Sequence, residues 1–107
     1  MITSLVAAAT IAMAGHNCVV PETPVVPISF EDMAEAERFK TGFLSYADDT
    51  QATLYCMTKY YEREYGEVTA DVYDSEFEPI IAARREAAQK FNMAYGNARL
   101  EEENRSD

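Results

Sequence analysis

Apolar residues recur at helical spacing in two long stretches of this chain. In the first stretch, a largely apolar stripe advances by three or four positions through Phe39, Phe43, Tyr46, Thr50, Leu54, Met57, Tyr61 and Tyr65. The second stretch carries a broader apolar face, formed by Phe77, Ile80, Ile81, Ala87, Ala88, Phe91, Tyr95 and Ala98. Such spacings place side chains on one face of an α-helix. The pattern therefore predicts an all-α fold built on two long amphipathic helices.

Capping signals set the expected bounds of the first helix. Ser29 followed by Asp32 resembles a capping box, in which a carboxylate at N3 reaches back to the cap. Ile28 and Met33 occupy the two positions of a hydrophobic staple. The first helix is therefore expected to begin directly after Ser29. It is expected to end before Gly66, since glycine suits the left-handed position that follows a helix.

Two features could interrupt this first helix. Gly42 is a weak helix former, and the Asp-Asp-Thr run at positions 48–50 could cap a new helix. The apolar stripe continues through both features. One helix is therefore favoured, and a bend near Asp48 stays open.

The second helix is expected to start near Ser75. Ser75 and Glu78 form a second capping box, and Pro79 is tolerated in a first helical turn. The Gly96-Asn97 pair could end or fray this helix. Residues 101–107 are a charge run that we expect to be a disordered acidic tail.

A polar segment at positions 67–74 connects the two helices, so residues 30–100 are predicted to form an antiparallel helical hairpin. A hairpin alone leaves one side of its interhelical groove open. Dimerisation into a four-helix bundle would close that side. Residues 15–29 could also close it as an extended arm. The arm has a proline at every third position, which places all three on one face of a polyproline II helix: Pro21, Pro24 and Pro27.

The arm is expected to pack along its own helices. Its aliphatic side chains would supply the contacts, namely Val19, Val20, Val25, Val26 and Ile28. The functional alternative is a polyproline ligand for an aromatic-lined groove of another protein. A tether at Cys18 and the absence of a flanking basic residue argue against that alternative.

The state of the two cysteines depends on the compartment. Residues 1–14 are uncharged and end in Ala12-Met13-Ala14, which resembles a secretory signal peptide without its basic start. A short N-terminal helix is the alternative. In an exported chain, Cys18 and Cys56 would form one disulfide that staples the arm to the middle of the first helix. In a reducing compartment they would be free thiols. The apolar run is too short to span a bilayer, so no membrane span is expected after processing.

The charge of the chain narrows the choice of partner. The formal net charge is −10, from nineteen acidic and nine basic residues. Such a surface repels nucleic acid phosphates and anionic lipids, and favours a basic protein partner. Twelve aromatic residues, seven Tyr and five Phe, are too many for a disordered acidic chain.

His16 is the one candidate metal ligand. Cleavage after Ala14 or one residue earlier would place His16 at position two or three of the mature chain. A free amine followed closely by histidine can chelate Cu(II) or Ni(II) in a square-planar nitrogen site. A lone histidine near a processing site is more often accidental, so the expected metal site is none.

Acidic residues gather around the helical connection without forming a recognisable site. They are Glu62, Glu64, Glu67, Asp71, Asp74, Glu76 and Glu78. Their spacing does not match a calcium-binding EF-hand loop, so a solvated acidic tip is the simpler interpretation. The chain has no G-x-S-x-G, no C-x-x-C and no second histidine, so we expect neither an enzyme nor a cofactor.

Two tyrosines fall off the apolar stripe of the first helix. Tyr55 and Tyr60 are therefore either exposed interface residues or packing partners for Pro24 and Pro27 of the arm. Aromatic side chains with a polar end are common at protein interfaces.

The order of motifs resembles small exported helical proteins of proteobacteria that have no assigned role. The motifs are Cys18 with its proline-rich arm, Cys56 within an aromatic helix, and Phe91-Asn92 near the end. The resemblance covers residues 18–95 and implies the disulfide and the helical hairpin. It implies no activity. Size, a single disulfide and helical content are also similar to acid-stress periplasmic chaperones, without a shared motif.

These observations favour a non-enzymatic exported protein, periplasmic or extracellular, that acts by binding another protein. The alternatives are periplasmic metal binding through His16, a stress-protective role like that of a chaperone, and a structural part of an envelope complex.

Overall fold

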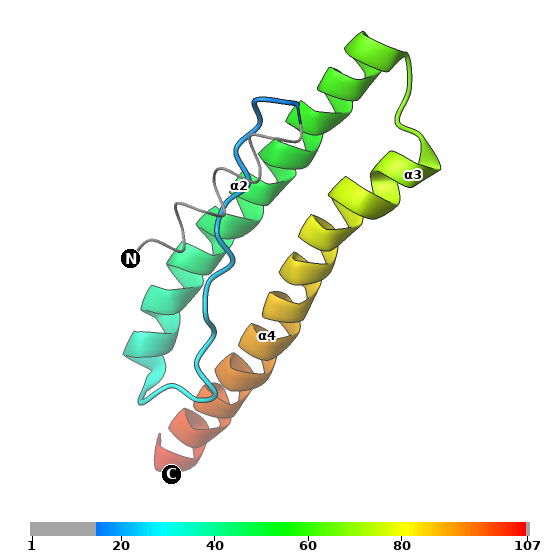
Figure 1. Ribbon diagram of the computed structural model, residues 1–107. Coiled ribbons are helices and arrows are strands. Elements are labelled where there is room, and N and C mark those ends of the chain that lie inside the picture. Colours follow the sequence, from blue (N-terminus) through cyan, green and yellow to red (C-terminus); the bar gives the residue numbers. More distant parts are fainter. Residues whose placement is uncertain (1–14, 107) are drawn as a thin grey trace, which may run out of the picture.

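The computed structural model describes residues 15–106, so the leader-like residues 1–14 lie outside the described part. The described elements are α2 (Met33–Tyr65), α3 (Ala70–Val72), the π-helical turn η1 (Tyr73–Phe77) and α4 (Glu78–Ser106). Figure 1 shows α2 and α4 side by side and antiparallel, with the arm running along them. The predicted all-α hairpin with a disulfide-stapled arm is confirmed.

Helix α2 runs without interruption past Gly42 and residues 48–50. Its first turn differs from the expectation. The N-cap is Asp32, whose carboxylate accepts a 2.9 Å hydrogen bond from the Glu35 amide, and Ser29 does not cap the helix. The Glu35 carboxylate in turn accepts from the amide of Glu31 at 2.6 Å. The capping residues thus lie three positions later than predicted.

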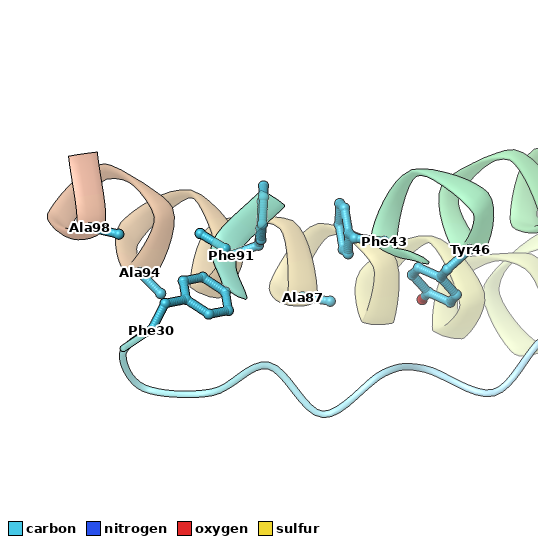
Figure 2. Packing of buried hydrophobic residues seen from close by; sticks show 8 residues of the cluster. Phe30, Phe43, Tyr46, Ala87, Phe91, Ala94 and Ala98 are labelled. Carbon is cyan, nitrogen blue, oxygen red and sulfur yellow. The ribbon is translucent and has the colours of Figure 1, made fainter. Parts of the chain in front are cut away.

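The reason for the shift is the side chain of Phe30. Its ring is 5 % exposed and contacts the rings of Phe39 and Phe91, with centroids 5.6 and 6.2 Å apart. Figure 2 shows Phe30 pointing from the end of the arm into the core. The non-helical backbone here lets the chain turn back with its ring inside. The expected staple is absent, since Ile28 is 96 % exposed.

A pair of substitutions distinguishes the two caps. Replacing Asp32 with alanine should lower the free energy of unfolding by about 1 kcal/mol, because it removes the cap of the Glu35 amide. Replacing Ser29 with alanine should change it by less than about 0.5 kcal/mol, because Ser29 is exposed and caps nothing. Urea unfolding followed by circular dichroism measures both values. Equal costs would contradict this assignment of the cap.

Gly66 ends α2 as predicted. It adopts φ 85°, and its amide donates to the Glu62 carbonyl at 2.9 Å. The next helical turn begins earlier than expected, because Thr69 caps α3 by accepting from the Val72 amide at 3.3 Å. Ser75 therefore lies inside η1 and is not a cap.

Helix α4 continues through the Gly96-Asn97 pair and as far as Ser106. The end or fraying that the sequence left open at this pair does not occur, and the structure is helical up to residue 106 where disorder was expected from residue 101. Ala94 and Ala98 are buried on either side of Gly96, so packing holds the helix together there. In the last turn, Arg105 pairs with Glu102 at 3.2 Å.

The core consists of two apolar clusters separated by a polar layer. The larger cluster, drawn in Figure 2, comprises Phe30, Ala36, Phe43, Tyr46, Ala87, Phe91, Ala94 and Ala98. The smaller one lies next to the connection and comprises Cys18, Met57, Tyr61 and Phe77. Between them, the Arg84 guanidinium donates to Thr50 Oγ1 and Gln51 Oε1, both at 3.3 Å. This contact satisfies Thr50, which is 1 % exposed.

The stripe predicted for the first helix is largely buried, with one error. Tyr65, the last residue of α2, is 68 % exposed. Ala36, Thr53 and Ala94 are buried although the stripes omit them.

Candidate functional site

The arm begins in a closely packed contact with the hairpin. Cys18 is bonded to Cys56 of α2, and their Cα atoms are 5.8 Å apart. Cys18 is buried, whereas Cys56 is exposed. His16 is also buried, and its Nδ1 accepts a 3.2 Å hydrogen bond from the Cys18 amide. The first residues of the arm are therefore held by a covalent bond and by a buried side chain.

Further contacts fix the arm along its length. The Thr53 hydroxyl of α2 donates to the carbonyl of Val19. The hydroxyls of Thr23 and Tyr46 form a 3.3 Å hydrogen bond. Val26 packs against the larger core cluster. With Phe30 buried at its other end, the arm is clamped to the hairpin at both ends and in the middle.

The two faces of the arm differ in exposure with a period of three. Pro21, Pro24 and Pro27 are all half-buried. The positions of the opposite face are all exposed, and we call them the outer row: Val19, Glu22, Val25 and Ile28. Val19, Val25 and Ile28 are 78, 90 and 96 % exposed. Polyproline II has three residues per turn, so this three-residue repeat of exposure is the one expected for a polyproline II helix.

The outer row corrects an expectation from the sequence. Val19, Val25 and Ile28 were expected to pack on the helices, but only Val20 and Val26 of the five aliphatic residues are half-buried. The prolines take the inner face instead. The sequence already indicates that the outer row shares one face, because the three-residue spacing that aligns the prolines also aligns positions 19, 22, 25 and 28.

The backbone of the arm is largely unpaired. Within residues 15–106, no hydrogen bond involves a backbone amide or carbonyl of residues 20–28. Their polar groups thus remain available to water or to a partner. An extended segment with free backbone groups and exposed aliphatic side chains is a form in which proteins recognise peptides.

Shallow hollows flank the arm on both sides. The hollow toward α2 is lined by Val19, Pro21, Asp49, Ala52, Thr53 and Cys56. The hollow toward α4 is lined by Thr23, Pro24, Val25, Val26, Ala83, Glu86, Ala87 and Lys90. The arm therefore stands as a ridge between two partly apolar depressions.

A buried polar cluster lies where the arm meets η1. His16 Nε2 is 3.7 Å from Glu76 Oε1, and the same carboxylate oxygen accepts a hydrogen bond from the Tyr61 hydroxyl. The rings of Tyr60 and Tyr61 meet the His16 ring edge-on, with centroids 6.0 and 6.4 Å away. The cluster thus joins the arm, α2 and the π-helical turn.

This geometry does not prepare His16 for a metal. An amino-terminal copper chelate uses an imidazole nitrogen beside the terminal amine. Here Nδ1 accepts from Cys18 and Nε2 faces Glu76, so His16 would have to leave its buried position. Among residues 15–106, no three histidine, cysteine, aspartate or glutamate side chains gather as metal ligands.

Tyr61 gives the cluster a pH dependence. Burial raises the pKa of Tyr61 above the ordinary 10.0, and Glu76 raises it further as hydrogen-bond acceptor and as a negative charge. Above about pH 10 the unfolded chain loses the Tyr61 proton and the folded chain keeps it. Stability should therefore fall as the pH rises, by up to about 1.4 kcal/mol per pH unit from this group.

Urea unfolding of the wild type and of Tyr61→Phe between pH 9 and 11 measures this slope. The two proteins differ only at residue 61, so the difference between their slopes isolates Tyr61. The wild type should lose stability more steeply than the variant. Parallel curves would contradict the role of Tyr61.

The two candidate interface tyrosines lie in different places. Tyr55 is 63 % exposed on α2, with Lys59 Nζ 5.4 Å from its ring centre. Tyr60 is half-buried beside the start of the arm. A Cβ at Gly15 would lie 3.2 Å from the Tyr60 hydroxyl, and Gly15 has φ 94°, so this contact needs glycine. Neither tyrosine lines the two hollows described beside the arm.

No helix among the described residues is long and apolar enough to cross a membrane. No protein-family model matches the chain, and no curated protein or solved structure matches it.

Proposed function

We propose that this protein is an exported, non-enzymatic module that binds another protein through the arm. The observation that carries the proposal is the outer row, whose aliphatic side chains are the three most exposed large hydrophobic residues described. Exposed apolar side chains that lie together on one surface mark interaction sites. Here they are held in place rather than displayed on a mobile loop.

The fixed position of the arm on the hairpin favours binding energetically. Ordering a flexible segment on binding costs affinity, and a segment already fixed in its bound form avoids that cost. The disulfide, the Thr53 and Tyr46 hydrogen bonds and the buried Phe30 fix the arm before any partner arrives.

A disulfide is compatible with export, because such bonds persist in oxidising compartments. If the apolar residues 1–14 are a leader cleaved after Ala14, the mature chain starts at Gly15. Intact-mass analysis of the protein recovered from its native compartment should then give a chain of residues 15–107 with two hydrogens missing. A mass that includes residues 1–14, or two free thiols, would argue against export.

Site-specific photo-crosslinking tests the binding function in cells. A photoreactive residue at position 25 should give an adduct of one defined mass. The matched control is the same residue at Met93, which is also exposed but lies on α4. Adding Ile28→Asp should remove the adduct at position 25. Equal adducts at both positions, or none at either, would overturn the proposal.

A further inference from the structure

The structure also indicates what kind of partner the arm fits, an inference that rests on the proposed function. We propose that the arm docks as a polyproline II ridge into a protein with an apolar groove and basic side chains at one end of it. The groove takes Val25 and Ile28. The basic side chains pair with Glu22 and Asp49.

The choice of polyproline II over a β-strand follows from the exposure pattern. A strand alternates its faces every second residue, whereas here burial and exposure repeat every third residue. A partner strand also needs regular amide donors, and Pro21, Pro24 and Pro27 have none. The prolines are half-buried whereas the outer row is exposed, so the outer row offers the more accessible surface to a groove. The partner therefore recognises the aliphatic outer row.

The basic end of the partner follows from two carboxylates. Within residues 15–106, neither Glu22 nor Asp49 has a side-chain hydrogen bond or ion pair. Asp49 lines the hollow beside Val19 and Pro21, and Glu22 is the next residue of the arm. In the other hollow Glu86 already pairs with Lys90 at 3.7 Å. These two uncompensated carboxylates lie beside the disulfide end of the ridge, where a lysine or arginine of the partner complements them.

Charge argues against a second copy of the chain as the occupant. Each copy carries a net charge of −10. Antiparallel pairing of two arms with their outer rows in full overlap would place Glu22 opposite Val25 of the other arm. The carboxylate would then meet an apolar side chain instead of a cation, which is unfavourable. A basic partner removes both problems.

The experiment starts from the photo-adduct at position 25, whose partner is identified by mass spectrometry, purified and titrated against the full chain. Val25→Asp and Ile28→Asp should each weaken binding at least tenfold. For Ser29→Asp, which changes an exposed neighbour outside the outer row, the affinity should stay within twofold of the wild type.

Glu22→Lys and Asp49→Lys should each weaken binding about fivefold or more at low salt, and less at high salt. Asp48→Lys is the matched control for Asp49→Lys and should stay within twofold. All these sites are exposed, so thermal unfolding should show that every variant folds.

The outcomes separate the two proposals. Absence of any adduct overturns the binding function and this inference with it. A partner whose binding responds equally to Ser29→Asp and Ile28→Asp, or ignores Glu22→Lys and Asp49→Lys, overturns the inference alone. An adduct of twice the chain mass identifies a second copy and also overturns it.

Discussion

Replacing both Cys18 and Cys56 with serine should lower the free energy of unfolding by about 4 kcal/mol. The bond joins residues 38 positions apart, and opening a loop of that length returns this much chain entropy to the unfolded state. A domain of this size has a total stability of roughly 5–15 kcal/mol, so the loss is a large fraction. Urea unfolding followed by circular dichroism at 25 °C measures it. The helical signal before the transition should be nearly unchanged, because α2 and α4 do not depend on the bond for their hydrogen bonds.

Two comparisons separate the bond from other effects of these substitutions. Wild-type protein reduced with a thiol reagent should lose nearly as much stability as the double variant. In reductant, Cys56→Ser should match the reduced wild type because its site is exposed, whereas Cys18→Ser should be less stable because it buries a hydroxyl. A loss below about 1 kcal/mol in the double variant would show that the hydrogen bonds of Thr53 and Tyr46 and the burial of Phe30 hold the arm without the disulfide.

The same double variant also probes the function. Without the bond, the start of the arm keeps the buried His16 and the Thr53–Val19 hydrogen bond but has no covalent link to α2. A less fixed outer row binds more weakly, since ordering it then costs free energy on association. Stability and affinity should therefore fall together in this variant, whereas Ile28→Asp should lower affinity alone.

The sequence predicts the hairpin well because its helical stripes are long. The stripe from Phe43 to Tyr61 spans five turns, and a period repeated that often leaves little ambiguity. The Cys18–Cys56 bond was predicted from two cysteines and an assumed exporting leader. The expected cover of the groove by the arm also agrees with the structure, as the contacts of Thr23 and Val26 show.

Local signals failed where a distant contact overrode them. Ser29 satisfies every short-range criterion for a cap, but burying the ring of Phe30 against Phe91 outweighs it and moves the cap to Asp32. Ser75 is not a cap, because helical structure already starts after Thr69 and Ser75 lies within η1. At Gly96, a residue that usually weakens a helix is held by buried Ala94 and Ala98.

The candidate site was the hardest part to predict. Periodicity showed that the prolines share a face, but it could not tell which face of the arm meets the hairpin. Aliphatic residues are usually buried, so the sequence favoured Val25 and Ile28 as the inner contacts. The structure reverses this, since the disulfide and the Thr23–Tyr46 hydrogen bond fix the rotation of the arm with the prolines inward.

Replacing Phe91 with alanine should lower the free energy of unfolding by about 3–5 kcal/mol. Its ring is 7 % exposed and stacks on Phe43 with centroids 5.1 Å apart and an interplanar angle of 12°. It also contacts the rings of Phe30, Phe39 and Tyr95. Apart from Tyr95, small alanines form the rest of the α4 face in this cluster, so little can move in to fill the cavity.

Met93 provides the matched control, two residues further along the same helix and 71 % exposed. Met93→Ala should change stability by less than about 0.5 kcal/mol, because almost no apolar area leaves the core. Phe91→Ala should also loosen the far end of the arm, where Phe30 loses one of its two ring partners. Amide hydrogen exchange of Glu35 and Ala36, which donate to Asp32, should therefore speed up, while that of residues 53–57 stays slow. If Phe91→Ala costs no more than Met93→Ala, the aromatic stack does not hold the hairpin together. The disulfide and the smaller cluster around Met57 would then supply most of its stability.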